Sequence, residues 1–172
     1  MISREHLLES LLKETNVIKH LYEKIPADAF DYRPTEKQRS MLELLRYLSV
    51  CGSASMHVIT NGSDWKTWKP FTDRSLTMEA KDFPAAMDLQ AKEMTEMLNA
   101  IPEEDFFNKE VKHPTGDLMP LGAGLIRMPF SWLTAYRMQL FLYLKEVGVT
   151  DIGTSNAWHG RDRTPPAAVA GK

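Results

Sequence analysis

Apolar residues recur three and four positions apart in four segments of the chain, which is the spacing of one face of an α-helix. The segments cover about residues 8–25, 41–59, 87–101 and 129–147. Gly148 follows the last of them and is a suitable helix end. No segment alternates with period two over more than a few residues, so the pattern predicts an all-α protein.

Two of these segments end in a similar way, which predicts an internal repeat. Residues 21–30 read LYEKIPADAF and residues 97–106 read MLNAIPEEDF. Proline cannot continue a helical hydrogen-bond ladder, and it pushes the preceding residue out of the α region. Each helix is therefore expected to stop at its isoleucine, Ile25 or Ile101. Two related helical hairpins follow, and together they predict a four-helix bundle.

The second segment contains a run of small residues, from Gly52 to Ser55, where another helix can approach closely. Residues 61–82 then form a connection too long for a tight helix–helix turn. An extended chain rises about twice as far per residue as a helix, so this connection could cross the length of the bundle. Helices two and three would then run parallel. Its aromatic residues, Trp65, Trp68 and Phe71, either pack along the bundle or, more simply, anchor the loop.

The composition changes after Gly148, where Gly, Pro and Ala become frequent. Paired prolines and small residues argue against a helix. We therefore predict a bundle over residues 1–150 and an extended C-terminal tail over residues 151–172. Trp158 is the expected anchor of this tail, on its own bundle or on a second subunit.

Length and charge restrict the class of protein. The chain has 172 residues, enough for one domain with a full core, and its net charge is -2. Acidic and basic residues are interleaved, so neither nucleic acid nor a membrane surface is an expected partner. The single cysteine, Cys51, and the lack of a signal-like segment or a run of about 18 apolar residues indicate a cytoplasmic protein.

Three stretches carry a resemblance to a known family. They are IPADAFDYRPTEKQRSMLELLRYL (25–48), IPEEDF (101–106) and WLTAYRMQLFLYLKEVG (132–148). With them the chain resembles the DinB-like (DinB/YfiT) superfamily of four-helix bundles over about residues 3–150. The resemblance implies an up-down-down-up bundle with a long crossover between helices two and three. It also implies a homodimer and, in many members, a divalent metal held by three histidines.

The sequence departs from the family at those histidines. On the resemblance, the histidine of helix two falls on Tyr47 and the pair on helix four falls on Trp132 and Tyr136. Indole has no free lone pair, and a tyrosine oxygen must lose a proton with a pKa near 10 before it binds a divalent ion. The remaining histidines do not show helical ligand spacing; they are His6, His20, His57, His113 and His159. We expect no metal and no other cofactor.

Helical spacing places several side chains around these three positions. Glu43, Tyr47 and Cys51 form a stripe along helix two, and helix four would face it with aromatic and amide groups. The candidate site residues are Glu43, Tyr47, Cys51, Trp132, Tyr136, Gln139 and Tyr143. The simpler interpretation is that aromatic rings fill the volume that a metal and its water occupy in other members. The alternative is an aromatic-lined pocket for a small or flat ligand between helices two and four.

Three functions remain open from the sequence. The leading hypothesis is a domain without catalytic activity, or with a ligand-binding pocket. The second is a thiol-dependent transferase or hydrolase of the DinB/YfiT type, with Glu43 or Tyr47 in acid–base work. The third is a protein-interaction module that uses the tryptophan-bearing loop and the tail. Cys51 as a nucleophile is disfavoured because no histidine is placed to activate it.

Overall fold

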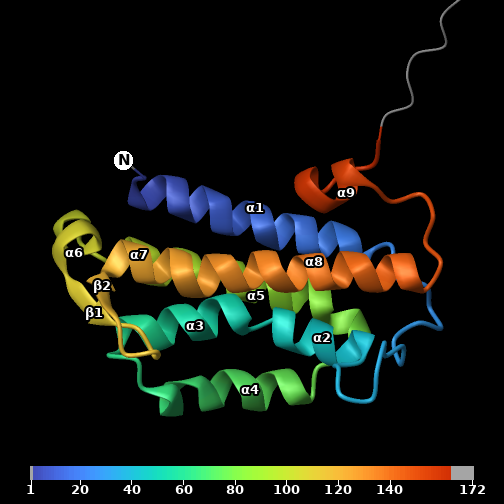
Figure 1. Ribbon diagram of the computed structural model, residues 1–172, viewed down its shortest axis with the longest axis horizontal. Helices are drawn as coiled ribbons and strands as arrows, with labels where there is room; N and C mark the ends of the chain where they lie inside the picture. The colour runs from blue at the N-terminus through green and yellow to red at the C-terminus, as the bar shows by residue number, and fades with distance from the viewer. Residues whose placement is uncertain (1, 164–172) are drawn as a thin grey trace, which may run out of the picture.

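A computed structural model describes residues 2–163 of the chain (Figure 1). The long helices are α1 (Arg4–Tyr22), α5 (Phe83–Asn99) and α8 (Ser131–Glu146), and the shorter ones are α2 (Met41–Leu48), α3 (Cys51–Thr60), α4 (Lys69–Leu76), α6 (Glu103–Asn108), α7 (Leu121–Leu125) and α9 (Thr154–His159). The protein is mostly helical, as the apolar spacing predicts. None of the helices between residues 2 and 163 combines the length and the apolar character needed to cross a membrane.

The core lies between the long helices. In Figure 1, α1, α5 and α8 lie side by side with the α2–α3 pair, and α4 runs along the outside of that pair. Leu11, Ile18, Leu45, Met94 and Leu140 are fully buried where these elements meet. A small antiparallel hairpin, β1 (Glu110–Lys112) and β2 (Leu118–Pro120), covers one end of the bundle and was not expected from the sequence. Its strands have three residues each, too few to show an alternating pattern.

Helices α1 and α5 stop slightly earlier than expected. The last residue of α1 is Tyr22 and that of α5 is Asn99, and each isoleucine that precedes a proline closes a turn after the helix. The amide of Ile25 donates to the carbonyl of Tyr22 across 3.0 Å, and that of Ile101 donates to Leu98 across 3.2 Å. The Ile-Pro pairs therefore mark the two ends correctly to within three residues.

The second apolar segment is two helices, with a break at Ser49 and Val50. Gln90 of α5 is fully buried and bonds to the backbone on both sides of this break. Its Nε2 donates to the carbonyl of Leu48 across 2.9 Å, and its Oε1 accepts from the amide of Gly52 across 2.7 Å. A Cβ on Gly52 would lie 2.8 Å from the sulfur of Met94, so a larger residue there would require the Met94 side chain to move. The expectation of close approach at Gly52 is confirmed.

The connection over residues 61–82 is folded rather than extended. It contains the short helices η1 (Trp65–Trp68) and η2 (Ala80–Asp82), with α4 between them. Pro70 lies in the first turn of α4, where its missing N–H costs no hydrogen bond. The connection crosses the bundle mainly as the helix α4 and not as an extended strand. As a result, α4 packs against α2.

The last apolar segment begins earlier than Pro129. Helix α7 continues through a π-helical turn, η3 (Ile126–Phe130), into α8. Pro129 lies inside this turn, and the hydroxyl of Ser131 donates to the carbonyl of Ile126 across 2.8 Å. A wide turn accommodates a residue that lacks an N–H, which explains why the proline does not start the helix.

Part of the predicted extended tail is helical. Helix α9 covers Thr154–His159 and lies over α1 (Figure 1). Gly160 ends it in the left-handed conformation, at φ 60°. The ring of Trp158, the predicted anchor, is 49% exposed and lies 4.8 Å from the guanidinium carbon of Arg137, while Asn156 and Ala157 are the buried residues of α9. Residues 164–172 of the predicted tail lie outside the described residues.

Candidate functional site

Two of the three family histidine positions meet in the structure. The rings of Tyr47 on α2 and Tyr136 on α8 have centroids 4.6 Å apart and are inclined by 60°. This edge-on contact fills the space between the two helices at that level. The convergence expected from helical spacing is therefore found for this pair.

The third position, Trp132, turns toward the connection rather than toward the tyrosines. Its ring stacks on Trp65 with centroids 6.2 Å apart and an angle of 13°, and it lies 5.6 Å from the ring of Trp68. Trp68 also stacks on Tyr47 at 6.2 Å. The tryptophans of the connection thus belong to the same aromatic cluster as Tyr47 and Trp132. Packing along the bundle, which the sequence left as the less simple alternative, describes them correctly.

Arg39 completes this cluster, although it was not among the residues predicted for the site. Its guanidinium carbon lies 4.2 Å from the centroid of Tyr47 and 5.5 Å from that of Tyr136. Aromatic faces attract cations in this geometry, by roughly 0.5–1 kcal/mol at exposed sites. Because Arg39 precedes the capping residue Ser40, it lies outside the helical repeat from which the other candidates were chosen.

Gln139 and Tyr143 hold the backbone at Arg39. The hydroxyl of Tyr143 donates to the carbonyl of Arg39 across 3.0 Å. The side-chain amide of Gln139 in turn donates to that hydroxyl across 2.7 Å. These two candidates therefore position the start of α2.

Cys51 is a core residue. It is fully buried, its thiol lies 3.9 Å from the carbonyl of Leu48, and burial raises its pKa to about 12. Burial also raises the pKa of Tyr47 above its usual value. Both groups are therefore protonated near neutral pH, which disfavours a thiolate nucleophile.

Glu43 has two structural partners. It accepts from the amide of Ser40 across 2.8 Å in a capping box, and it forms an ion pair with Arg33 at 3.0 Å. The hydrogen bond from Arg33 lowers the pKa of this carboxyl group. Glu43 is a weak candidate for a general base, because a general base works best with a pKa near neutral and the pKa of Glu43 is lowered.

Two clefts meet at Tyr47 and Trp68. The first has a volume of about 320 Å³ and lies between α2 and α4; its lining is Arg39, Glu43, Arg46, Tyr47, Val50, Trp68, Thr72, Ser75 and Leu76. The second, of about 340 Å³, is lined by Tyr47, Trp65, Trp68 and Trp132. Four of the predicted site residues line neither of these clefts: Cys51, Tyr136, Gln139 and Tyr143. The first cleft therefore lies on the α4 side of Tyr47, and the second touches α8 only at Trp132, while the sequence placed the pocket between helices two and four.

Comparison with known proteins identifies the fold. No family model matches the chain. The uncharacterized protein YjoA of Bacillus subtilis (strain 168) is 24% identical over 156 residues, which cover 88% of this chain and 96% of YjoA. A crystal structure of a DinB-like protein from Bacillus subtilis, YjoA, superposes with a TM-score of 0.66 at 22% identity, over 86% of this chain and 95% of that one. The chain has the DinB-like fold. The DinB-like fold that the sequence resemblance implies is confirmed.

The residues of this DinB-like chain do not fit a metal of the three-histidine type. Burial raises the pKa of the Tyr47 phenol, which disfavours the ionised form that a divalent metal needs, and Trp132 offers no ligand atom. A guanidinium already lies over both tyrosine rings, and a second cation at that place would be repelled. Across residues 2–163, no three His, Cys, Asp or Glu side chains are grouped closely enough to hold a metal ion.

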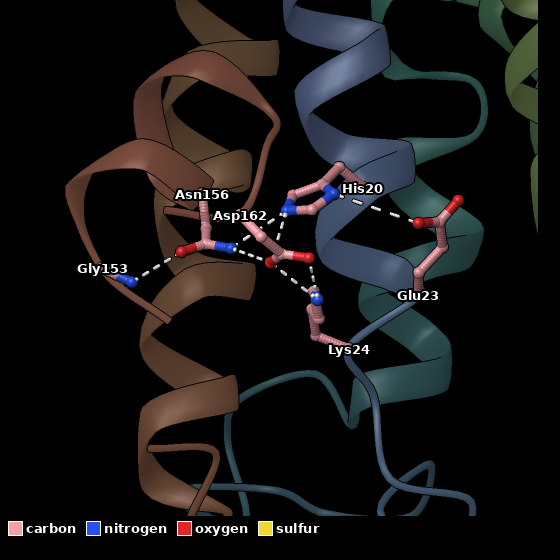
Figure 2. A network of polar contacts seen from close by, with 6 residues as sticks. All are labelled: His20, Glu23, Lys24, Gly153, Asn156 and Asp162. Atoms are coloured by element: carbon pink, nitrogen blue, oxygen red, sulfur yellow. Dashed lines mark hydrogen bonds and ion pairs between the residues drawn. The ribbon is translucent and has the colours of Figure 1, made fainter. Parts of the chain in front are cut away.

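A second polar cluster joins α1 to α9 of the DinB-like bundle (Figure 2). Figure 2 shows Asn156 between His20 and Asp162: its Nδ2 lies 3.0 Å from Nε2 of His20 and 2.8 Å from a carboxylate oxygen of Asp162. Its Oδ1 accepts from the amide of Gly153 across 2.8 Å, and Lys24 forms an ion pair with Asp162 at 2.7 Å. Every polar atom of the Asn156 side chain has a partner. The cluster therefore serves to fix α9 on α1.

Proposed function

We propose that this chain binds a small, flat organic ligand in the cleft between α2 and α4, without a metal at the family position. The observation that carries the proposal is the paired aromatic wall of Tyr47 and Trp68, whose rings stack at the side of a cleft of about 320 Å³. Ligand pockets in proteins begin at about 300 Å³ and combine apolar walls with a few polar groups. This cleft has both.

Binding is favoured over catalysis by the chemistry of the same residues. The titratable groups of the cleft move away from neutral pKa values, since that of Glu43 is lowered and that of Tyr47 is raised. General acid–base catalysis works best with a pKa near the operating pH. The structure therefore supports a binding site better than a transferase or hydrolase site.

The test is calorimetric titration of the purified protein with a panel of one- and two-ring aromatic acids, amides, amines and thiols. Trp68→Ala removes one wall of the cleft and should weaken the best ligand by up to about tenfold, because an aromatic pair contributes roughly 0.5–1.5 kcal/mol. Trp65→Ala is the matched control, since Trp65 lines only the second cleft. Thermal melting checks that both variants fold.

Each outcome decides something. A panel without any ligand overturns the proposal, and so does binding that Trp68→Ala leaves unchanged. A larger loss with Trp65→Ala than with Trp68→Ala would move the ligand to the second cleft and overturn the assignment to α2 and α4. Binding of the ligand with turnover would favour the enzyme hypothesis.

The bundle topology is part of the proposal. We propose the up-down-down-up order. The colour gradient of Figure 1 supports it, since it runs one way along α1 and α8 and the other way along α2–α3 and α5. Helix α4 would then return the chain between the two halves. A homodimer and a cytoplasmic location, both expected from the sequence, complete the proposal; light scattering and cell fractionation test them.

A further inference from the structure

We infer that the ligand of this cleft is an organic anion, a carboxylate on a planar apolar body, held by the guanidinium groups of Arg39 and Arg46. This inference rests on the proposed function and narrows it to one class of ligand. It follows from the hydrogen-bonding state of three charged side chains, taken one at a time.

The guanidinium of Arg39 has N–H donors that are available for a ligand. Its guanidinium lies against the face of Tyr47, 4.2 Å from the ring centroid. Among the described residues its side chain takes part in no hydrogen bond or ion pair, although it is only partly exposed. A guanidinium that is stacked by its face keeps its N–H groups directed outward along its edge, where they match the two oxygens of a carboxylate.

Arg46 is held by one atom only. Its Nε donates to the carbonyl of Met78 across 2.9 Å, which fixes the side chain between α2 and the end of the connection. No partner for its two terminal nitrogens lies within the described part of the chain, and Arg46 lines the same cleft as Arg39. Arg46 lies on α2, and Arg39 directly precedes the capping residue of that helix, Ser40.

The carboxylate in the lining of this cleft already has partners. Glu43 lies on the same wall, but its side chain accepts from the amide of Ser40 and forms an ion pair with Arg33 at 3.0 Å. With Arg33 and Glu43 compensating each other, Arg39 and Arg46 leave an excess of positive charge in a partly enclosed cleft. Low-dielectric walls strengthen the attraction of such a cleft for an anion.

The rest of the lining determines the body of the ligand. Tyr47 and Trp68 form a stacked wall, and Val50 and Leu76 add aliphatic surface. A planar apolar body can lie against these rings while its carboxylate meets the two guanidiniums. An inorganic anion would leave the aromatic wall uncovered, and a neutral flat molecule would leave the guanidiniums unpaired.

The experiment compares shape-matched probes: benzoate with benzamide, and 2-naphthoate with 2-naphthamide. Calorimetry at low salt should show at least tenfold tighter binding of each acid than of its amide. Arg39→Gln and Arg46→Gln should each remove most of that preference. Arg127→Gln is the control, because Arg127 is exposed on η3 and pairs with Asp117 at 3.7 Å, away from the cleft. Raising the salt concentration should weaken the acids and not the amides.

The anion inference and the proposed function fail in different ways. If acid and amide bind equally, and Trp68→Ala weakens both, the cleft binds flat ligands and the anion inference is overturned. If no probe binds, both are overturned. Should Arg39→Gln lower the melting temperature, Arg39→Lys keeps the charge without the planar fork and is expected to restore part of the acid preference. If neither Arg46→Gln nor Arg39→Lys weakens the binding of the acids, the inference is overturned.

Discussion

The carboxylate of Glu14 on α1 accepts a hydrogen bond from Nε of Arg137 on α8 across 2.6 Å, and these side chains are only 11% and 1% exposed. The same guanidinium donates to the carbonyl of Ala157 and lies under the ring of Trp158. One buried cation therefore connects α1, α8 and α9. The Arg-x-Gln-Leu pattern of the last long helix thus has a structural role at its arginine.

The first prediction concerns this ion pair. Arg137→Met should lower the free energy of unfolding by about 3–5 kcal/mol, because it leaves the buried carboxylate of Glu14 without a partner. Glu14→Gln should have a smaller effect, since the amide still accepts a hydrogen bond. Urea denaturation followed by circular dichroism measures both.

The double variant Glu14→Leu/Arg137→Met separates the pair from the burial of its members. It should recover most of the loss seen in Arg137→Met, because no buried charge remains. The recovery should fall short by about 1 kcal/mol, since the carbonyl of Ala157 still lacks its donor. A double variant no more stable than Arg137→Met alone would contradict this explanation.

The second prediction concerns the break between α2 and α3. Gln90→Leu keeps the apolar volume but leaves the carbonyl of Leu48 and the amide of Gly52 buried without partners. At roughly 1–3 kcal/mol for each buried group, the free energy of unfolding should fall by about 2–6 kcal/mol. Leu89→Gln is the control, since Leu89 is exposed on the same helix, and it should change stability by less than about 0.5 kcal/mol. An unchanged Gln90→Leu variant would show that the break needs no side-chain cap.

Local pattern predicted the helical class and the helix ends, because both depend on residues close together in the chain. The break at Ser49 and Val50 did not follow from it. The small residues around Gly52 signalled a close approach, but the group that satisfies the open backbone is Gln90, 38 residues further on. A contact at that separation leaves no periodic trace in either segment.

The candidate site shows the same division. Tyr47 and Tyr136 could be paired from helical spacing and from the family resemblance, since both lie inside regular helices. Arg39 and Trp68 could not, because one precedes the cap of α2 and the other lies in a 3₁₀ turn of the connection. The cation that lies over the tyrosine pair was therefore missed. At two of the positions where the resemblance expects histidines, this chain has tyrosine rings with the guanidinium of Arg39 over them.

The third prediction concerns the attachment of α9. Asn156→Leu removes the partners of the Gly153 amide and of Asp162 in the cluster of Figure 2. Amide hydrogen exchange in residues 153–162 should become faster by roughly tenfold, which corresponds to about 1.4 kcal/mol of local stability. Exchange in α5 should stay unchanged, because no bond of Asn156 reaches it. His159→Ala, an exposed change on the same short helix, is the control. If amide exchange became equally faster in both variants, the attachment would depend on the helix as a whole and not on the side-chain amide of Asn156.

The fourth prediction is a loss of stability at alkaline pH that depends on Cys51. Burial raises the pKa of this thiol from an ordinary value of 9.0 to about 12, so the folded state holds the proton more tightly than the unfolded state. A group of this kind contributes fully below pH 9, and its contribution is lost as the pH rises toward 12. Between pH 8 and pH 10 the unfolded thiol ionises and the folded one does not, which removes about 1.4 kcal/mol.

Cys51→Ala isolates this contribution. The variant starts from a lower stability because it leaves a small gap in the core. From pH 8 to pH 10, however, its free energy of unfolding should fall by about 1.4 kcal/mol less than that of the unchanged protein. Lysines and Tyr32, whose pKa is raised to about 12 by its bond to Glu146, titrate alike in both proteins and cancel in the comparison. Parallel pH profiles would mean that the thiol ionises as easily in the folded core as in the open chain, and they would contradict its burial. A thiol reagent at pH 8 gives a second check, because only the unfolded protein should react with it.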